Sequence, residues 1–342
     1  TTLLRYILSQ NHGYRIAVVQ NEFAEEMGIE SPTLVDGASG EPFKDLWELP
    51  NGCICCSAKD DFIAAIDALL NTPSGAALEY IIVESTGLAD PEAVIQTFWV
   101  DDNLELNVFL DGVVTVVDMT RIVEQLDSSV SETTTIARKQ LVCADVVLCN
   151  KMDLIRNSRR NNGYGHSEML RTLSTFNPEA SYLETEHGVV DLAKILKLGA
   201  FNPTATSDRL LRDMEASMVC GTVSQPAPSF GGSGQISQLQ AHGISSVVVK
   251  LQTSISTQKL EAFLAEVLWE AGEKEHGRKI LRAKGIFLDA ETRKPSALQA
   301  VGEIFEVVEV PVKAELVLQA KFLFLGYHLA KGWLEGKLQA CV

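Results

Sequence analysis

Residues 145–153 read DVVLCNKMD, an apolar run that leads directly into four mostly polar residues. A short run without polar alternation is typical of a strand buried on both faces, as in a parallel sheet. Comparable runs occur at residues 15–20 (RIAVVQ), 80–83 (YIIV), 113–118 (VVTVVD) and 181–183 (SYL). Helical patterns lie between them, for example at residues 62–70, where apolar side chains recur on one face. This alternation of strands and helices predicts a doubly wound α/β domain with a parallel sheet.

The composition changes beyond residue 201. Pro, Ser and Gly accumulate over residues 202–243, as is typical of a linker. Strand-like runs then follow at 245–251, 280–288, 297–308 and 322–325, and a last helical pattern covers 329–338. We therefore expect three parts: the doubly wound domain at 1–201, the linker at 202–243 and a small α+β domain at 244–342.

The chain has 342 residues with 29 Lys and Arg against 45 Asp and Glu, a formal net charge of −16. Such an acidic surface repels phosphate backbones, which argues against a nucleic-acid partner. No apolar run reaches the ~18 residues that a membrane helix needs, so we expect no membrane partner. The sequence starts with Thr1 and Thr2 instead of Met, and we expect further residues to precede them in the gene product.

The apolar run at 145–149 is followed by Asn150, Lys151, Met152 and Asp153. At the end of a parallel strand, the carboxylate of Asp153 can accept hydrogen bonds from N1–H and the 2-amino group of guanine, a donor pair that adenine lacks. Asn150 can bond the O6/N7 edge, and the stem of Lys151 can cover the ring. Such a site discriminates strongly, since a wrong base leaves buried polar groups unpaired. The competing interpretation is a surface turn that caps the next helix.

A second motif, YIIVESTG at residues 80–87, ends an apolar strand with a carboxylate. In phosphate-transfer enzymes a carboxylate at this place orients Mg²⁺ or its water, so Glu84 is a candidate for that role. Gly87 follows three residues later, and its N–H can approach a γ-phosphate because no Cβ blocks it. An ordinary strand-to-loop transition would show the same pattern.

A phosphate-binding loop of the form G-x-x-x-x-G-K-[ST] should precede these motifs, and it does not occur in the sequence. Residues 1–8 (TTLLRYIL) nevertheless look like the first turns of the helix that follows such a loop. Thr1 would then be the final Ser/Thr of the loop, whose hydroxyl contacts Mg²⁺, with Thr2 beside it. We therefore predict a P-loop NTPase-like doubly wound parallel sheet whose first strand and phosphate loop are missing from this sequence.

Three of the seven cysteines, Cys53, Cys55 and Cys56, crowd into the segment GCICC at 52–56. Thiolates at these spacings can converge on one ion if the backbone turns, which the preceding Asn-Gly pair permits. Zinc takes four ligands with Zn–S near ~2.3 Å, so three thiolates leave one position open for a ligand from elsewhere, and an open position suits a carrier that releases its metal. Two other interpretations remain open: a redox pair formed by Cys53 and Cys56, and a buried inert cluster.

The thiol cluster lies between Asn21-Glu22-Phe23 and the strand that ends in Glu84. In a GTPase with this order of motifs, these segments flank the γ-phosphate and switch when it leaves. A metal held between them would respond to the nucleotide state.

The order of these motifs resembles that of the CobW-type GTPases, whose mark is a GCxCC metal motif between switch segments. The motifs that carry the resemblance are Asn21-Glu22-Phe23, GCICC at 52–56, ESTGLADP at 84–91 and NKMD at 150–153. The segments FWVD at 98–101, LDG at 110–112, LRAKG at 281–285 and the ending from 322 look like the eukaryotic zinc-chaperone branch, zinc-regulated GTPases that activate metalloproteins. The resemblance covers nearly the whole chain.

This resemblance implies a GTPase that hydrolyses GTP and delivers zinc to a client metalloenzyme, of which type 1 methionine aminopeptidase is the family's example. It implies GTP, Mg²⁺ and Zn²⁺ as cofactors. Thr1 and Glu84 would serve Mg²⁺, the first switch segment would contain Glu22, the guanine would be bound by Asn150, Lys151 and Asp153, and zinc would be held by Cys53, Cys55 and Cys56. We expect a cytoplasmic protein, with the nucleus as a second location and a homodimer as one form of assembly.

The sequence departs from the family at Ala24, where the family usually has glycine, and in lacking the phosphate loop and an N-terminal client-docking segment. The missing loop leaves a second hypothesis, a non-catalytic, metal-responsive binding module descended from such a GTPase. A third is a chaperone for another metal such as cobalt, because three thiolates favour soft or borderline ions without selecting one.

Overall fold

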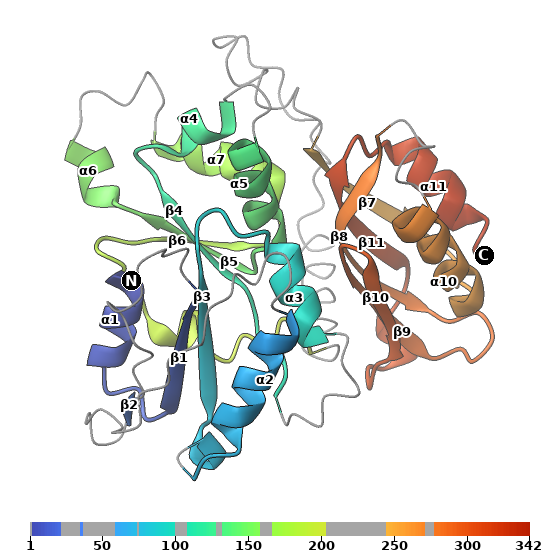
Figure 1. The fold of residues 1–342 in the computed structure, drawn as a ribbon. Coiled ribbons are helices and arrows are strands. Elements are labelled where there is room, and N and C mark those ends of the chain that lie inside the picture. Colours follow the sequence, from blue (N-terminus) through green and yellow to red (C-terminus); the bar gives the residue numbers. More distant parts are fainter. Residues whose placement is uncertain are drawn as a thin grey trace.

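The structure, a computed structural model, describes residues 2–21, 35–36, 59–73, 75–99, 108–127, 132–157, 166–202, 244–270 and 277–342. These residues form an α/β domain followed by a second domain built on an antiparallel sheet (Figure 1). Within the described ranges no helix is both long and apolar enough to cross a membrane.

The strands of the first domain form two three-stranded sheets, where the apolar runs predicted a single parallel sheet. In one, β1 (Arg15–Asn21) pairs in parallel with β3 (Tyr80–Ser85) and antiparallel with the short β2 (Val35–Asp36). In the other, β4 (Val114–Asp118), β5 (Val146–Asn150) and β6 (Ser181–Glu184) are all parallel, with β5 in the centre. The expected parallel α/β architecture is thereby confirmed.

Burial on both faces explains why β5 has no polar alternation. Val147 and Cys149 pack with α4 (Ile122–Asp127), α5 (Glu132–Cys143) and α7 (His166–Phe176) on one face of the sheet. Val146 and Leu148 pack on the other face with Leu4 and Ile7 of α1 (Thr2–Ser9) and with Ile16 and Val18 of β1. That second cluster contains side chains from both three-stranded sheets, so a single apolar core unites them.

The remaining elements of the first domain surround these sheets. They are α2 (Lys59–Leu70), η1 (Gly75–Ala77), α3 (Pro91–Trp99), α6 (Met152–Asn157) and η2 (Leu192–Lys194). Pro91 opens α3, where its missing N–H is harmless because the first N–H groups of a helix have no partner within it.

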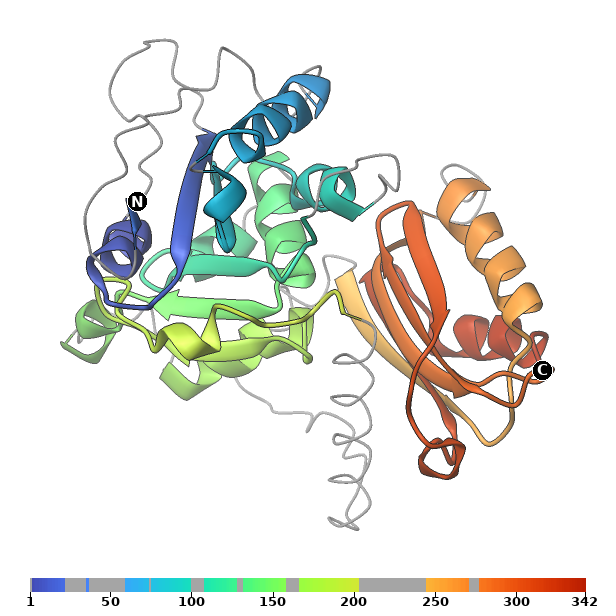
Figure 2. The same ribbon diagram turned by 90° about the horizontal axis from the view of Figure 1, so that it is seen from below.

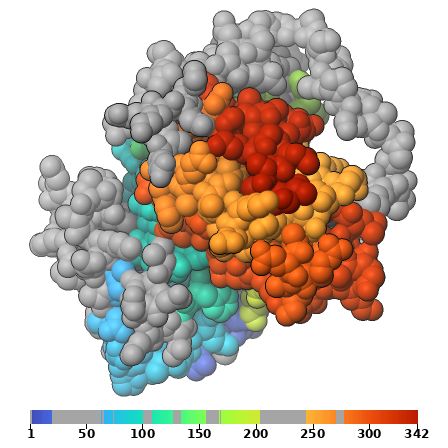
Figure 3. Space-filling model, turned by 90° about the vertical axis from the view of Figure 1, so that its right-hand side faces the viewer, coloured from blue at the N-terminus to red at the C-terminus, as the bar shows by residue number. Residues whose placement is uncertain are grey.

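The second domain is a five-stranded antiparallel sheet in the order β10-β9-β8-β11-β7. Its strands are β7 (Ile244–Leu251), β8 (Lys279–Leu288), β9 (Pro295–Val301), β10 (Ile304–Glu309) and β11 (Ala320–Tyr327), with η4 (Ala314–Leu316) before β11. The helices α10 (Thr257–Ala265) and α11 (Lys331–Gln339) and the π-turn η3 (Glu266–Glu270) cover one face (Figure 2). These helices form the outer surface of the molecule, and the opposite face of the sheet meets the first domain (Figures 1 and 3).

The single strand expected at residues 297–308 is two strands in the structure, β9 and β10. Residues 297–308 read as a single apolar run, whereas β9 ends at Val301 and β10 begins at Ile304. Gly302 adopts φ 57° in the turn between them, a conformation that glycine takes at little cost. Because both strands are apolar, periodicity alone did not reveal the turn.

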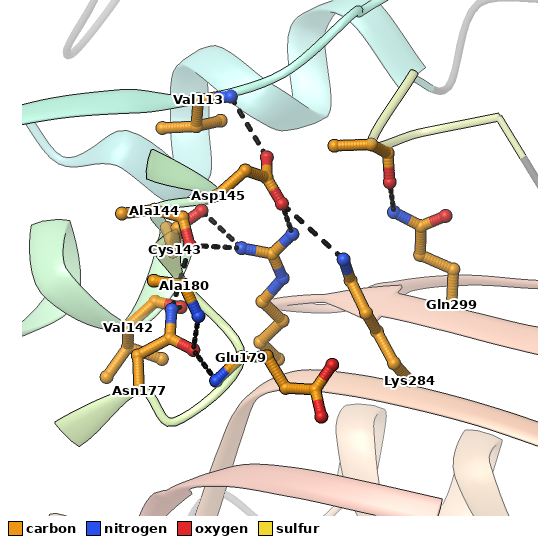
Figure 4. A network of polar contacts seen from close by, with 12 residues as sticks. Val113, Val142, Cys143, Ala144, Asp145, Asn177, Glu179, Ala180, Lys284 and Gln299 are labelled. Atoms are coloured by element: carbon orange, nitrogen blue, oxygen red, sulfur yellow. Dashed lines mark hydrogen bonds and ion pairs between the residues drawn. The ribbon is translucent and has the colours of Figure 1, made fainter. Parts of the chain in front are cut away.

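A buried ion cluster joins the two domains (Figure 4). Asp145, just before β5, is paired with Arg282 of β8, while Lys284 of the same strand lies 3.4 Å from its Oδ1 and the N–H of Val113 donates to its Oδ2 at 3.0 Å. Arg282 also donates to the carbonyls of Cys143 and Ala144 at the end of α5, at 2.5 and 3.0 Å. Burial alone would raise the pKa of Asp145, but the two cations outweigh it and hold that pKa below its ordinary value.

Arg282→Ala is expected to lower the free energy of unfolding by about 3 kcal/mol, because it leaves the buried carboxylate of Asp145 with Lys284 as its one remaining cation among the described residues. Urea unfolding followed by tryptophan fluorescence measures the change. The matched control is Lys294→Ala, which removes the cation of an exposed pair with Glu309 at 2.8 Å and should cost less than about 1 kcal/mol. Equal effects of the two substitutions would contradict the structural role of the Arg282–Asp145 pair.

Candidate functional site

The candidate guanine-binding turn follows β5 directly. The strand ends at Asn150, Lys151 forms the turn, and Met152 and Asp153 open the short helix α6. Strands β4, β5 and β6 are parallel, so Asp118, Asn150 and Glu184 end at the same edge of the sheet. Ligands of doubly wound sheets bind at this edge.

The side chain of Asn150 is held in one orientation. Its Oδ1 accepts hydrogen bonds from Thr185 Oγ1 at 3.2 Å and from the N–H of Gly188 at 3.1 Å. Thr185 and Gly188 lie in the loop after β6. Because the oxygen is engaged by this loop, the NH₂ end of the amide is the end that a base acceptor can use.

Lys151 turns the chain in a left-handed conformation with φ 65°. A residue with a Cβ pays roughly 1–3 kcal/mol for such a backbone, so the surroundings must stabilise it. Two backbone hydrogen bonds do so: the N–H of Met119 donates to the carbonyl of Asn150, and the N–H of Met152 donates to the carbonyl of Thr185, both at 3.2 Å. The turn is therefore tied to the ends of both neighbouring strands.

The loop after β6 also contacts the start of α1. Gly188 has φ 72°, and a Cβ placed on it would lie 3.1 Å from Leu3 Cα and 3.2 Å from Leu3 N. The side chain of Thr2, one of the expected nucleotide contacts, is exposed at the first residue of this helix. The N-terminal turn of α1 and the turn after β5 are thus connected through one loop.

The second motif ends β3 as expected. Glu84 is half-buried near the end of the strand, and Thr86 begins a turn in which the N–H of Ala89 donates to its carbonyl at 3.0 Å. Gln140 of α5 holds this loop, because its Nε2 donates to the carbonyl of Gly87 at 3.3 Å and to that of Ala89 at 3.1 Å.

Gly87 has no packing reason to be glycine among the described residues. It is exposed, its φ is not in the left-handed region, and a Cβ placed on it would meet no atom within 4 Å. Among the described residues, local packing therefore gives no reason for glycine at this position.

Five of the candidate site residues, namely Thr1, Glu22, Cys53, Cys55 and Cys56, lie outside the described residues. Within the described part of the chain, no group of three or more His, Cys, Asp or Glu side chains could hold a metal. The cysteines described there, Cys143, Cys149 and Cys341, are buried core thiols. Burial raises the pKa of Cys143 and Cys149 to about 12, so both remain protonated thiols.

Four residues of this region were not predicted: Asp118, Gln140, Thr185 and Gly188. Thr185 and Gly188 follow the strand at 181–184, and polar residues at the end of the next parallel strand are a usable signal. Gln140 lies within a helical pattern that gives no such signal. Asp118 ends an apolar run, as Glu84 does, and the same argument would have selected it.

Comparison with known proteins adds a family match over most of the chain. The family model described as "CobW/HypB/UreG, nucleotide-binding domain" matches residues 1–184, and the "Cobalamin synthesis protein cobW C-terminal domain" matches residues 244–342. Zinc-regulated GTPase metalloprotein activator 1 of Schizosaccharomyces pombe is 31% identical over 93% of this chain and 76% of its own. Zinc chaperone YjiA of Escherichia coli is 30% identical over 86% of this chain and 80% of its own.

Solved structures show the same fold. The Zn(II)-bound YjiA GTPase from E. coli aligns with 100% of this chain and 94% of its own at 23% identity, with a TM-score of 0.64. A Zn(II)-bound triple mutant of YjiA aligns with 99% of this chain and 94% of its own at 22% identity, with a TM-score of 0.66.

Gly188→Ala is expected to lower the free energy of unfolding by about 1–3 kcal/mol, because alanine is strained at φ 72° and its Cβ would press on Leu3. Thermal and urea unfolding measure the loss. Gly336→Ala in α11 is the matched control: a Cβ there meets nothing within 4 Å, and alanine favours a helix. A Gly188→Ala protein as stable as wild type would disprove the close approach of this loop to α1.

Proposed function

Because this chain belongs to the CobW/HypB/UreG family, we propose that it is a GTP-hydrolysing zinc chaperone that delivers zinc to a client metalloenzyme. The observation that carries the proposal is the turn after β5, in which Asn150 is oriented by Thr185 and Gly188. A turn that only capped α6 would not need an asparagine held by the loop after β6.

Guanine recognition divides among three residues of this turn. The NH₂ end of Asn150 faces the O6/N7 edge of the base, the stem of Lys151 covers the ring, and the carboxylate of Asp153 accepts from N1–H and the 2-amino group. Asp153 lies in the first turn of α6, two residues after Lys151, whose left-handed backbone turns the chain. This division of roles makes the site selective for guanine over adenine.

The phosphate end of the nucleotide is assigned to the end of β3, the loop that follows it and residues 1–2 at the start of α1. Glu84 orients Mg²⁺ or its water, and Thr1 and Thr2 supply hydroxyls to the metal and the phosphates. The N–H of Gly87 meets the γ-phosphate, on a residue whose Cβ position has no atom within 4 Å. Magnesium neutralises charge on the transferred phosphoryl group, while Glu22 lies in the segment that we propose as the first switch.

Zinc is the cargo. Cys53, Cys55 and Cys56 supply three thiolates, a set that fits zinc and leaves one coordination position through which a client can receive the ion. Several relatives are named zinc chaperones or zinc-regulated GTPases. We propose a zinc-dependent metalloenzyme as client, with type 1 methionine aminopeptidase as the first to test, in the cytoplasm or the nucleus.

Replacing Cys53, Cys55 and Cys56 by Ser together is expected to abolish tight zinc binding, because hydroxyls are far poorer zinc ligands than thiolates. Competition with a chromogenic zinc chelator at fixed free metal measures the affinity. Cys341→Ser, which changes a buried thiol at the end of α11, is the control and should bind zinc as wild type does. Unchanged zinc affinity in the triple mutant refutes the metal site, and tighter binding of Co²⁺ than Zn²⁺ by wild type would favour the cobalt alternative.

Asp153→Asn is expected to reduce kcat/KM for GTP by roughly 100-fold, because two hydrogen bonds to a charged acceptor are lost. The same substitution should improve the use of XTP, whose 2-oxo group can accept a hydrogen bond from the new amide. Phosphate release measures both reactions. Wild-type protein that hydrolyses neither nucleotide would refute the proposed activity and favour a non-catalytic binding module.

A further inference from the structure

Asp118, the last residue of β4, belongs to the nucleotide site through its contact with Lys151. Its Oδ2 lies 2.6 Å from the ammonium of Lys151. The two residues are adjacent because β4 and β5 pair in register, with Asp118 opposite Asn150. The ammonium of Lys151 is thus bound at the edge where the base is expected.

The carboxylate of Asp118 is itself fixed. Its Oδ1 accepts from the N–H of Thr120 at 2.9 Å and from Thr120 Oγ1 at 2.6 Å, while its Oδ2 pairs with Lys151. Burial alone would raise the pKa of Asp118, but the hydrogen bonds from Lys151 and Thr120 outweigh it and lower that pKa. The group is therefore ionised at neutral pH and has a single orientation.

Lys151 is held at both ends as a result. Its backbone is fixed in the left-handed turn and its ammonium is paired with Asp118, so the four methylene groups lie between two fixed ends. The side chain nevertheless remains 49% exposed, so the stem is accessible to a ligand. A lysine that is already ordered loses little further side-chain entropy when a base binds, so pre-ordering favours binding.

We propose that Asp118 is a positioning residue for guanine nucleotides, which acts by holding the stem of Lys151 against the plane of the base. The inference rests on the proposed function and adds to it a residue outside the N-K-x-D motif.

The test compares binding of GDP and IDP to wild type, Asp118→Asn, Lys151→Met and the double variant by calorimetry. Asparagine keeps the size of the side chain, and methionine keeps an unbranched stem without the charge. We expect each single change to weaken both nucleotides by between about threefold and tenfold. The double variant should bind no more weakly than the weaker single variant, because one interaction is lost in all three.

The ratio of GDP to IDP affinity distinguishes a loss of Lys151 positioning from a general distortion of the turn that would also displace Asp153. IDP lacks the 2-amino group that Asp153 recognises, so loss of an ordered Lys151 stem should leave the ratio unchanged, whereas a displaced Asp153 should lower it. Thr120→Val removes one anchor of the carboxylate and should produce a smaller loss of the same kind. Glu309→Gln, in an exposed pair of the second domain, is the control and should have no effect.

The inference alone would be overturned by wild-type affinity in Asp118→Asn, or by losses in the two single variants that multiply in the double variant. A changed ratio of GDP to IDP affinity would also overturn it. If wild-type protein binds neither nucleotide, the proposed function fails and the inference falls with it, a pattern distinct from the others.

Discussion

The carboxylate of Asp145 is the charge on which the arrangement of the two domains depends. It lies 4% exposed between them and is compensated by Arg282, Lys284 and the N–H of Val113. An uncompensated carboxylate in this place would cost several kcal/mol, so these partners are obligatory. They fix the start of β4, the end of α5 and the centre of the second sheet at one point. Strand β5 starts beside that point and ends at the turn that we propose binds guanine.

Helix α5 connects the same point to the segment after β3. Near its C-terminal end, Gln140 binds the carbonyls of Gly87 and Ala89, and Lys139 pairs with Asp90 at 2.5 Å. Glu92, in the first turn of α3, lies 3.5 Å from Lys139 and 3.4 Å from Lys279 of β8. The loop assigned to the γ-phosphate therefore contacts a helix whose last carbonyls bind Arg282. One set of ion pairs therefore joins the loop after β3 and the start of α3 to β8 of the second domain.

Features that follow from local sequence pattern, such as the buried strands, were predicted from the sequence. Contacts that follow from the register between strands were not. The apolar runs identified β1, β3, β4, β5 and β6, because burial on both faces removes polar alternation. The two strands at 297–308 were read as one, because the turn at Gly302 interrupts two runs that are both apolar. Asn150, Lys151 and Asp153 were predicted from their position after a strand. Thr185 and Asp118 were not predicted, although both stand at the ends of apolar runs. Their contacts with Asn150 and Lys151 themselves arise only when the parallel strands align. The thiol cluster stays a prediction, since Cys53, Cys55 and Cys56 lie outside the described residues.

The Arg282–Asp145 pair has a consequence for the order of folding during synthesis. The first domain leaves the ribosome first, yet the cation that neutralises Asp145 is 137 residues further along the chain. At typical rates of elongation, roughly 5–20 residues per second, the nascent domain waits on the order of ten seconds with a carboxylate that its own residues do not neutralise. Until β8 has been synthesised, the carboxylate of Asp145 lacks its cation partners and is more stable in contact with water than buried. The packing around Asp145 can thus be completed only after β8 has been synthesised.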